Sequence, residues 1–265
     1  MKIFSSRTDS NGRFMIERTR DFRPTWDLNL TEPVSSNYYP VDTRIAVVED
    51  TNEVITDSRR QLWVMNDRAQ GGTSLRSGQI ELMLHRRLFN DDAFGVGEPL
   101  NETAFGVGLV VRGRHRLLLC EDTELHCDME ARKEAERMLM KPVIMFGPEC
   151  SDLNNAENTF DPLPDGVKIL TLEKWGNNKA VLVRLENINL DTSKTVSMTK
   201  VLKKIGDVTD VQETTLDGNM NLDDLNRLNW NENISKRGKS RNQGIDPENI
   251  HIQPKQIRSF IFTFQ

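Results

Sequence analysis

The sequence predicts a mainly β fold built from antiparallel sheets, and three observations indicate it. In several short segments apolar and polar residues alternate with a period of two, as in strands with one buried face. Clusters of Gly, Asn, Asp and Ser, which favour turns, separate these segments. A single stretch has the length and apolar spacing of a convincing helix. Many short strands joined by turns favour an antiparallel sandwich.

Four segments show the alternation most clearly, and in each every second residue is apolar, which places a row of apolar side chains on one face of the predicted strand: residues 79–85, 107–112, 181–186 and 259–264. In the last segment Phe260, Phe262 and Phe264 share a face. We expect these three rings to form the core of a C-terminal sheet, because aromatic side chains bury large apolar areas.

One helix is predicted over residues 128–140, with a shorter helical turn at residues 222–228. Asp128 is suited to cap the first turn of the longer helix, because a carboxylate accepts hydrogen bonds from the free N–H groups there. The negative charges of Glu130 and Glu134 suit the N-terminal, positive end of the helix dipole. Pro142 ends the helix.

A domain boundary is expected within residues 148–165, which are polar, contain three prolines and show no periodicity. Residues 1–150 are therefore assigned to a large β-sandwich region, and residues 151–265 to a smaller terminal β-sandwich. Residues 229–243, rich in Asn, Lys, Arg and Gly, are predicted to form a surface loop.

Composition argues against two classes of partner. The 35 basic and 40 acidic residues give a net charge of −5, so we expect no nucleic-acid partner. No run approaches about 18 apolar residues, the length that a membrane-spanning helix needs, so we expect no membrane partner.

Cysteines and glycosylation sequons are informative about the cellular compartment of the protein. Cys120 and Cys127 flank a short turn and are candidates for a disulfide, with three ordinary buried thiols as the equally open alternative. Three Asn-x-Ser/Thr sequons, at Asn29, Asn101 and Asn233, would be used only in the secretory pathway. The N-terminal residues lack the apolar stretch of a signal peptide, so we expect any such signal to lie upstream of this sequence.

No catalytic or metal-binding motif stands out. The four histidines do not pair at metal-ligand spacing. Asp91 and Asp92 are adjacent acidic residues, as are Asp223 and Asp224, but neighbouring side chains seldom face one glycosidic bond together. We therefore expect both pairs to cap turns, and a small hydrolase that uses Asp91 and Asp92 is a remote alternative.

Longer motifs resemble one family. Residues 8–40 read TDSNGRFMIERTRDFRPTWDLNLTEPVSSNYYP, residues 66–75 read NDRAQGGTSL, and residues 78–88 read GQIELMLHRRL. RGRH at residues 112–115 and QETTL at residues 212–216 follow in order. The whole chain thereby resembles the C-terminal part of lysosomal-type α-mannosidases of glycoside hydrolase family 38.

This resemblance implies a fold and a function. Family members are zinc-dependent retaining enzymes that hydrolyse α-mannosidic bonds of N-glycans, and they act in the lysosome or the secretory pathway. Their catalytic Asp and zinc ligands lie in an N-terminal domain that this sequence does not match. We therefore expect no catalytic residue and no zinc in this chain, which would be inactive alone. The implied fold is a galactose-mutarotase-like β-sandwich followed by a smaller one, and the implied partners are the N-terminal catalytic half and mannose-containing glycans.

One loop departs from the family pattern. Where the family reads DD.RG, this chain reads Asp91-Asp92-Ala93-Phe94-Gly95. The resemblance implies that the loop leans toward the sugar pocket and that its arginine lines the pocket, a role in which Phe94 cannot donate hydrogen bonds. The favoured expectation is that Phe94 packs against a neighbouring strand. Residues 70–75, expected to form a turn, and residues 91–100 are the candidate contacts with the catalytic half.

The main alternative is a protein of a different class. A β-sandwich derived from the enzyme would act by itself as a non-catalytic carbohydrate-binding or interaction module. Such a module is expected to be a soluble monomer that ignores the catalytic half, whereas a portion of the enzyme should bind it.

Overall fold

The computed structural model describes residues 3–50, 58–95, 97–144, 146–147, 161–176, 179–225 and 244–265. The chain divides into two compact units, Met1–Val143 and Ile144–Gln265. The boundary predicted between residues 150 and 151 falls in a stretch that lies outside the described residues. The strands pair antiparallel throughout the described residues, which confirms the mainly β fold class.

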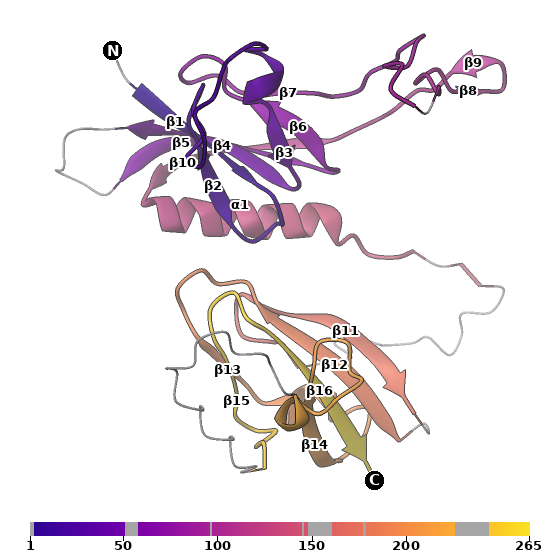
Figure 1. The fold of residues 1–265 in the computed structure, drawn as a ribbon. Helices are drawn as coiled ribbons and strands as arrows, with labels where there is room; N and C mark the ends of the chain where they lie inside the picture. The colour runs from indigo at the N-terminus through magenta and orange to yellow at the C-terminus, as the bar shows by residue number, and fades with distance from the viewer. Residues whose placement is uncertain are drawn as a thin grey trace. The chain divides into compact units, whose positions relative to one another are not determined.

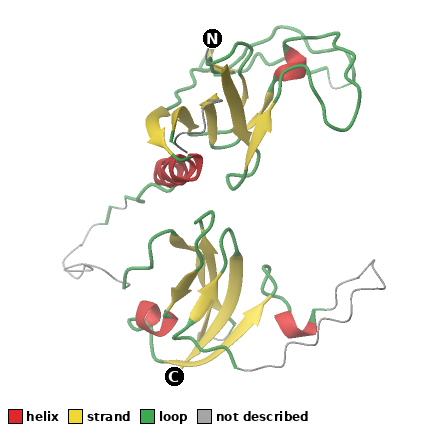
Figure 2. Ribbon diagram, turned by 90° about the vertical axis from the view of Figure 1, so that its left-hand side faces the viewer, coloured by secondary structure: helices red, strands yellow, loops and turns green. Residues whose placement is uncertain are grey.

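The first unit is organised around a five-stranded sheet. Its strands run in the order β10-β5-β4-β1-β2. They span His115–Asp122 (β10), Arg59–Asn66 (β5), Arg44–Asp50 (β4), Ile3–Asp9 (β1) and Met15–Arg18 (β2). Helix α1, Glu124–Leu139, lies along one face of this sheet (Figure 1) and is seen nearly end-on in Figure 2. Trp63 and Met65 of the sheet pack there against Ala131 and Met138 of the helix.

A smaller sheet covers part of the opposite face. It contains β3 (Tyr39–Val41), β6 (Gln70–Thr73) and β7 (Glu81–Leu82), and a 3-10 turn, Ser35–Asn37, precedes β3. Ile45 and Val64 of the large sheet are buried against Val41, with Leu82 beside them. The packing is tight at Gly72, where an added Cβ would lie 2.6 Å from a methyl group of Val41 in β3 and 3.2 Å from one of Ile45 in the large sheet. Glycine is therefore required for this packing.

Two predicted strands are much shorter than their alternation indicates. Of residues 79–85 only Glu81–Leu82 form a strand, β7, and of residues 107–112 only Val107–Gly108 form one, β9, paired with β8 (Thr103–Ala104). Ile80 and Leu82 point into the core as predicted, but Leu84 and Val107 are exposed. A strand needs a partner along its edge and a layer on its apolar face, and most of these residues have neither within the described part of the chain.

Helix α1 begins four residues before the predicted start. Thr123 caps it, because its hydroxyl accepts a hydrogen bond from the backbone N–H of His126 (3.3 Å). A disulfide between Cys120 and Cys127 joins the end of β10 to the first turns of the helix, which resolves the open question of these thiols. Asp128 therefore lies inside the helix. Near the second predicted helical turn, Leu222–Asp224 form a 3-10 turn, and residues 226–228 lie outside the described residues.

The second unit contains a four-stranded sheet in the order β11-β12-β16-β14. Its strands span Val167–Trp175 (β11), Ala180–Asn187 (β12), Ile257–Phe264 (β16) and Val208–Thr214 (β14). A two-stranded sheet, β13 (Lys194–Val196) with β15 (Ile250–Ile252), and helix α2, Met198–Leu202, complete the core. Both predicted strands in this unit are confirmed, and Phe260, Phe262 and Phe264 are all buried in that core.

Candidate functional site

The loop predicted to face a sugar pocket is held together by its own two carboxylates. One oxygen of Asp91 accepts hydrogen bonds from the backbone N–H groups of Ala93 (3.2 Å) and Gly97 (3.1 Å). Asp92 accepts one from the N–H of Phe94 (3.1 Å). The turn-capping role expected for this pair is thus confirmed. These bonds present the aromatic ring at the surface of the loop.

Phe94 does not pack against a neighbouring strand, so that expectation is wrong. Its side chain is 91% exposed, between Ala93 and Gly95, which both adopt positive φ angles. A left-handed alanine is uncommon, and here the Asp91 carboxylate stabilises the turn that contains it. The loop therefore holds a large apolar ring in solvent, a position that a partner or a ligand would have to cover.

Three of the four histidines each have a polar neighbour. His115 contacts Gln70, His126 lies near Asp122 and His251 lies near Thr195. Among the described residues, no group of three or more His, Cys, Asp or Glu side chains is placed to hold a metal ion.

The three sequons differ in their surroundings. Asn29 is exposed. Asn101 is half-buried, and its side-chain oxygen accepts a hydrogen bond from Nε of Arg87 (2.6 Å). Asn233 lies outside the described residues. Use of the described sequons stays a prediction.

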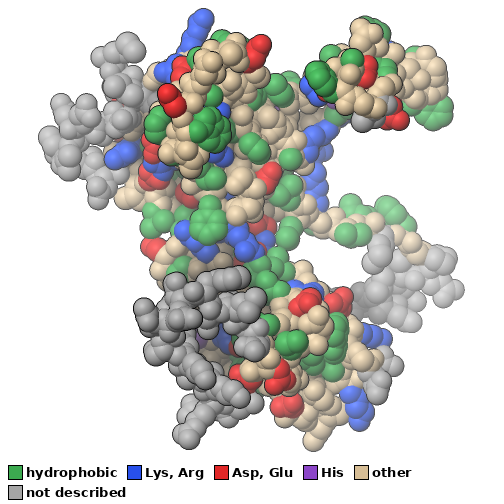
Figure 3. Space-filling view, viewed as in Figure 1, with side chains coloured by type: hydrophobic (Ala, Val, Ile, Leu, Met, Phe, Trp, Pro, Cys, Tyr) green, Lys and Arg blue, Asp and Glu red, His purple; other side chains and the backbone are tan. Residues whose placement is uncertain are grey.

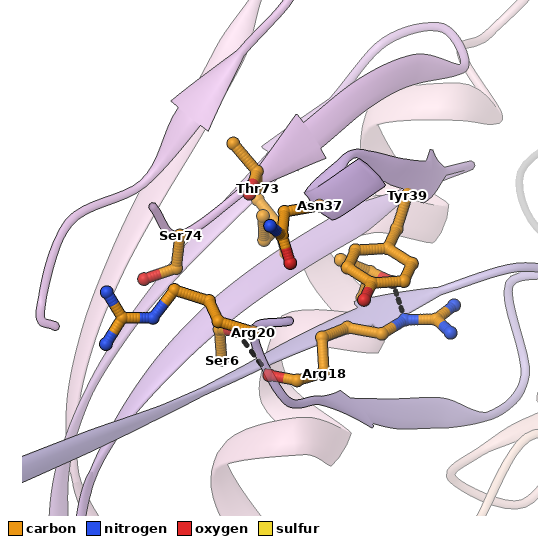
Figure 4. Close-up of a pocket in the computed structure, with 9 residues that line it drawn as sticks. Ser6, Arg18, Arg20, Asn37, Tyr39, Thr73 and Ser74 are labelled. Carbon is orange, nitrogen blue, oxygen red and sulfur yellow. Dashed lines mark hydrogen bonds between the residues drawn. The ribbon is translucent and has the colours of Figure 1, made fainter. Parts of the chain in front are cut away.

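A polar cavity lies between the two sheets of the first unit, and Figure 4 shows the side chains around it. Nε of Arg18 donates a hydrogen bond to the hydroxyl of Thr8 (2.9 Å), and its guanidinium lies 4.4 Å from the centre of the Tyr39 ring. Burial lowers the pKa of the Arg18 side chain. The cavity volume is about 10 Å³, room for one water molecule. It is therefore too small to bind a mannose ring.

A basic groove opens where β10 begins and α1 ends. It is lined by the side chains of Arg114, Arg116, Arg137 and Lys141, among others, and its volume is about 580 Å³. The carboxylate of Glu134 forms ion pairs with both Arg116 and Arg137. Arg137 is the main cause of the lowered pKa of that carboxyl. Because the single carboxylate of Glu134 pairs with two arginines, the side chains that line the groove carry a net positive charge.

A buried ionic centre joins β1, β4 and α1. Arg44 and Asp9 are both fully buried. Asp9 accepts hydrogen bonds from the backbone N–H groups of Gly12 (3.0 Å) and Arg44 (3.0 Å) and from the hydroxyl of Thr43 (2.7 Å). Arg44 donates from Nε to Asp128 of α1 (3.0 Å). Arg44 thus links the sheet to the helix, and Asp9 of the TDSNG segment holds Arg44 in place. The sequence of this segment indicated only a turn.

Within the described residues, no helix is long and apolar enough to cross a membrane.

Two family models match the chain. One, described as the glycosyl hydrolases family 38 C-terminal domain, matches residues 5–94, within the first unit. The other, described as the glycosyl hydrolases family 38 C-terminal beta sandwich domain, matches residues 166–260, within the second unit. The two matches follow the order of the structural units.

Similar proteins point to the same family. Lysosomal alpha-mannosidase of Homo sapiens is 41% identical over 274 residues, that of Cavia porcellus 40% over 277, and an alpha-mannosidase of Arabidopsis thaliana 34% over 280. Each match covers 97% of this chain but only 26% of the relative, so the chain spans about a quarter of the length of these relatives. The chain therefore belongs to glycosyl hydrolase family 38, and it corresponds to the C-terminal portion of the family's enzymes.

Proposed function

We propose that this chain is the C-terminal, β-rich portion of a zinc-dependent retaining α-mannosidase that removes terminal α-mannosyl residues from N-glycans. In this role it supports the catalytic portion and contributes a loop to the sugar pocket, without supplying catalytic residues. Relatives that match 97% of the chain are named as α-mannosidases, and several are named as lysosomal. The lysosome or the secretory pathway is therefore the compartment we propose.

Among the described residues, no three or more His, Cys, Asp or Glu side chains are grouped so that they could hold a metal ion. In the proposed enzyme the metal and the nucleophilic carboxylate belong to the catalytic portion. The disulfide between Cys120 and Cys127 agrees with an oxidising compartment, where such bonds form and persist.

The observation that carries the proposal is an exposed apolar arm, residues 83–95 and 97–111. Many of its large apolar side chains are exposed, including Leu84, Phe89, Phe94, Phe105 and Val110. Green hydrophobic side chains are visible on the projecting tip of this arm in Figure 3. Large contiguous apolar patches are rare on proteins that act as monomers and mark interaction sites. In a stand-alone monomeric sandwich these apolar side chains would stay exposed to water, which is unfavourable.

The contacts expected at residues 70–75 need correction. Gln70–Thr73 form strand β6, which pairs with β3 on one side and β7 on the other. Gly72, Thr73 and Ser74 are buried. This segment therefore belongs to the core, and residues 91–100, which are exposed where described, remain the proposed contact with the catalytic portion.

Activity of a reassembled enzyme tests the proposal. The partner is a separately produced catalytic portion, the part of the Homo sapiens enzyme outside the matched region. With zinc and an aryl α-mannoside, the chain alone should show no turnover, and the mixture should show turnover together with a complex in light scattering. A monomer that neither binds the partner nor raises its activity would favour the stand-alone module. Turnover by the chain alone, lost in Asp92→Ala, would favour the small hydrolase.

A substitution tests the proposed place of Phe94. In the reassembled enzyme, Phe94→Arg restores the family residue and its hydrogen-bond donors, and we expect KM for the aryl mannoside to fall severalfold. Leu216→Arg, at an exposed position of the second unit, is the matched control and should leave KM unchanged. Equal KM values for Phe94→Arg and the unmodified chain would remove Phe94 from the pocket.

A further inference from the structure

The two edges of the five-stranded sheet are unequal. Strand β2 at one edge has four residues and ends in Glu17 and Arg18. Short edge strands with charged side chains resist pairing with other strands. Strand β10 at the other edge has eight residues, contains Leu117, Leu118 and Leu119, and pairs only with β5 within the described chain. An edge of this length leaves N–H and C=O groups ready to pair with a further strand.

On the face of β10 that points away from α1, the two central side chains are apolar and exposed. Leu118 and Cys120 point toward α1 and pack in its core. Leu117 and Leu119 alternate with them and therefore point to the opposite face, where they are 71% and 81% exposed. Val64, directly opposite Leu117 on β5, is buried under the smaller sheet. The smaller sheet therefore reaches β10 only at His115, which contacts Gln70, and it leaves Leu117 and Leu119 uncovered.

We propose that the open edge of β10 accepts a β-strand from the catalytic portion of the enzyme, and that a layer of this portion covers Leu117 and Leu119. The inference rests on the proposed function, because it takes its partner from there. Addition of a strand to a sheet edge supplies backbone hydrogen bonds, and side chains on alternate positions supply specificity. The bound strand should place apolar side chains opposite Leu117 and Leu119.

A second copy of the chain fits this surface less well. Two β10 strands can pair antiparallel about a two-fold axis perpendicular to the sheet, and each face of the sheet then continues into the same face of the other copy. Leu117 and Leu119 of both copies would then share one uncovered surface, which doubles the exposed apolar patch. The smaller sheet removes Val64 from water. Leu117 and Leu119 are removed from water only if the partner contributes a similar layer that packs on them.

The test combines a binding measurement with hydrogen exchange. Lysines on an edge strand block pairing, so Leu117→Lys with Leu119→Lys should weaken binding to the catalytic portion of the Homo sapiens enzyme by about 100-fold or more. Leu216→Lys, 54% exposed in the second unit, is the control and should bind like the unmodified chain. Since both β10 side chains are exposed, the melting temperature of the double variant should stay within about 2 °C.

Hydrogen exchange of the unmodified chain gives a readout that needs no variant. The amides of β10 that point away from β5 should exchange quickly in the free chain and slowly in the complex. This readout decides the matter if the double variant fails to fold.

The outcomes separate the two proposals. If the unmodified chain does not bind the catalytic portion, both proposals fail. If it binds, but the double variant binds equally well or the β10 amides stay unprotected, the β10 inference is overturned and the proposed function stands. If the chain alone forms a dimer that the double variant abolishes, the occupant of the edge is a second copy and the inference is again overturned.

Discussion

Replacing Asp9 with Asn should destabilise the first unit strongly, because Asp9 neutralises a fully buried arginine. The Asp9 carboxylate accepts hydrogen bonds from Gly12, Thr43 and Arg44, and one of its oxygens lies 3.9 Å from a guanidinium nitrogen of Arg44. An asparagine keeps one acceptor oxygen but turns an N–H₂ group toward these donors. Arg44 then retains Asp128 as its single carboxylate partner within the described residues, at 2.9 Å.

The size of the effect follows from burial. Removing one partner of a buried ion pair typically costs about 3–5 kcal/mol, because an uncompensated charge stays in the interior. Asp128 still offsets part of the charge, so we expect about 3 kcal/mol for Asp9→Asn. This is a large share of a domain stability of about 5–15 kcal/mol. For a unit of this size it corresponds to a fall in melting temperature of about 10 °C.

Differential scanning calorimetry is the appropriate assay, since the two units can unfold in separate transitions. Asp91→Asn is the matched control, because Asp91 also accepts two backbone hydrogen bonds but is exposed. The control should shift its transition by no more than a degree or two. If Asp9→Asn melts as close to the unmodified chain as the control does, the buried ionic centre does not hold the sheet to the helix.

Three further predictions concern stability. Phe262→Ala should cost the second unit about 3–5 kcal/mol by loss of a buried ring, seen as a lowered melting transition, and an unchanged transition would mean that the ring is not core. Reduction of the Cys120–Cys127 disulfide should cost the first unit about 2.5 kcal/mol in the chain-entropy model, while the double Ser variant should not respond to reductant. Glu134→Gln should lower stability at neutral pH but not in acid, because Arg137 lowers the pKa of this carboxyl in the fold. Its stabilisation is therefore present above the ordinary carboxyl pKa and is lost as the pH falls through the folded value, so equal effects in urea unfolding at both pH values would contradict the assignment.

Part of the fold and of the candidate site could be predicted because the signals are local. Residues 181–186 and 259–264 alternate with a period of two, and the structure forms strands at both places. Asp91 and Asp92 were expected to cap a turn, and they accept the N–H groups of their own loop. The expectation that Phe94 packs against a strand was wrong, because the sequence shows that the side chain is apolar but does not show whether a strand lies beside it.

The sequence by itself determined the family, the fold class and the apolar side of each strand. The family follows from the order of motifs along the chain, and the apolar side follows from the alternation of neighbouring residues. The tertiary structure decided how these faces are used. It brings Asp9, Arg44 and Asp128 together across separations of 35 and 84 residues, and it leaves Leu117 and Leu119 of an alternating strand without cover. A period of two shows which side of a strand is apolar, but burial of that side depends on a second layer whose position is fixed only when distant segments pack.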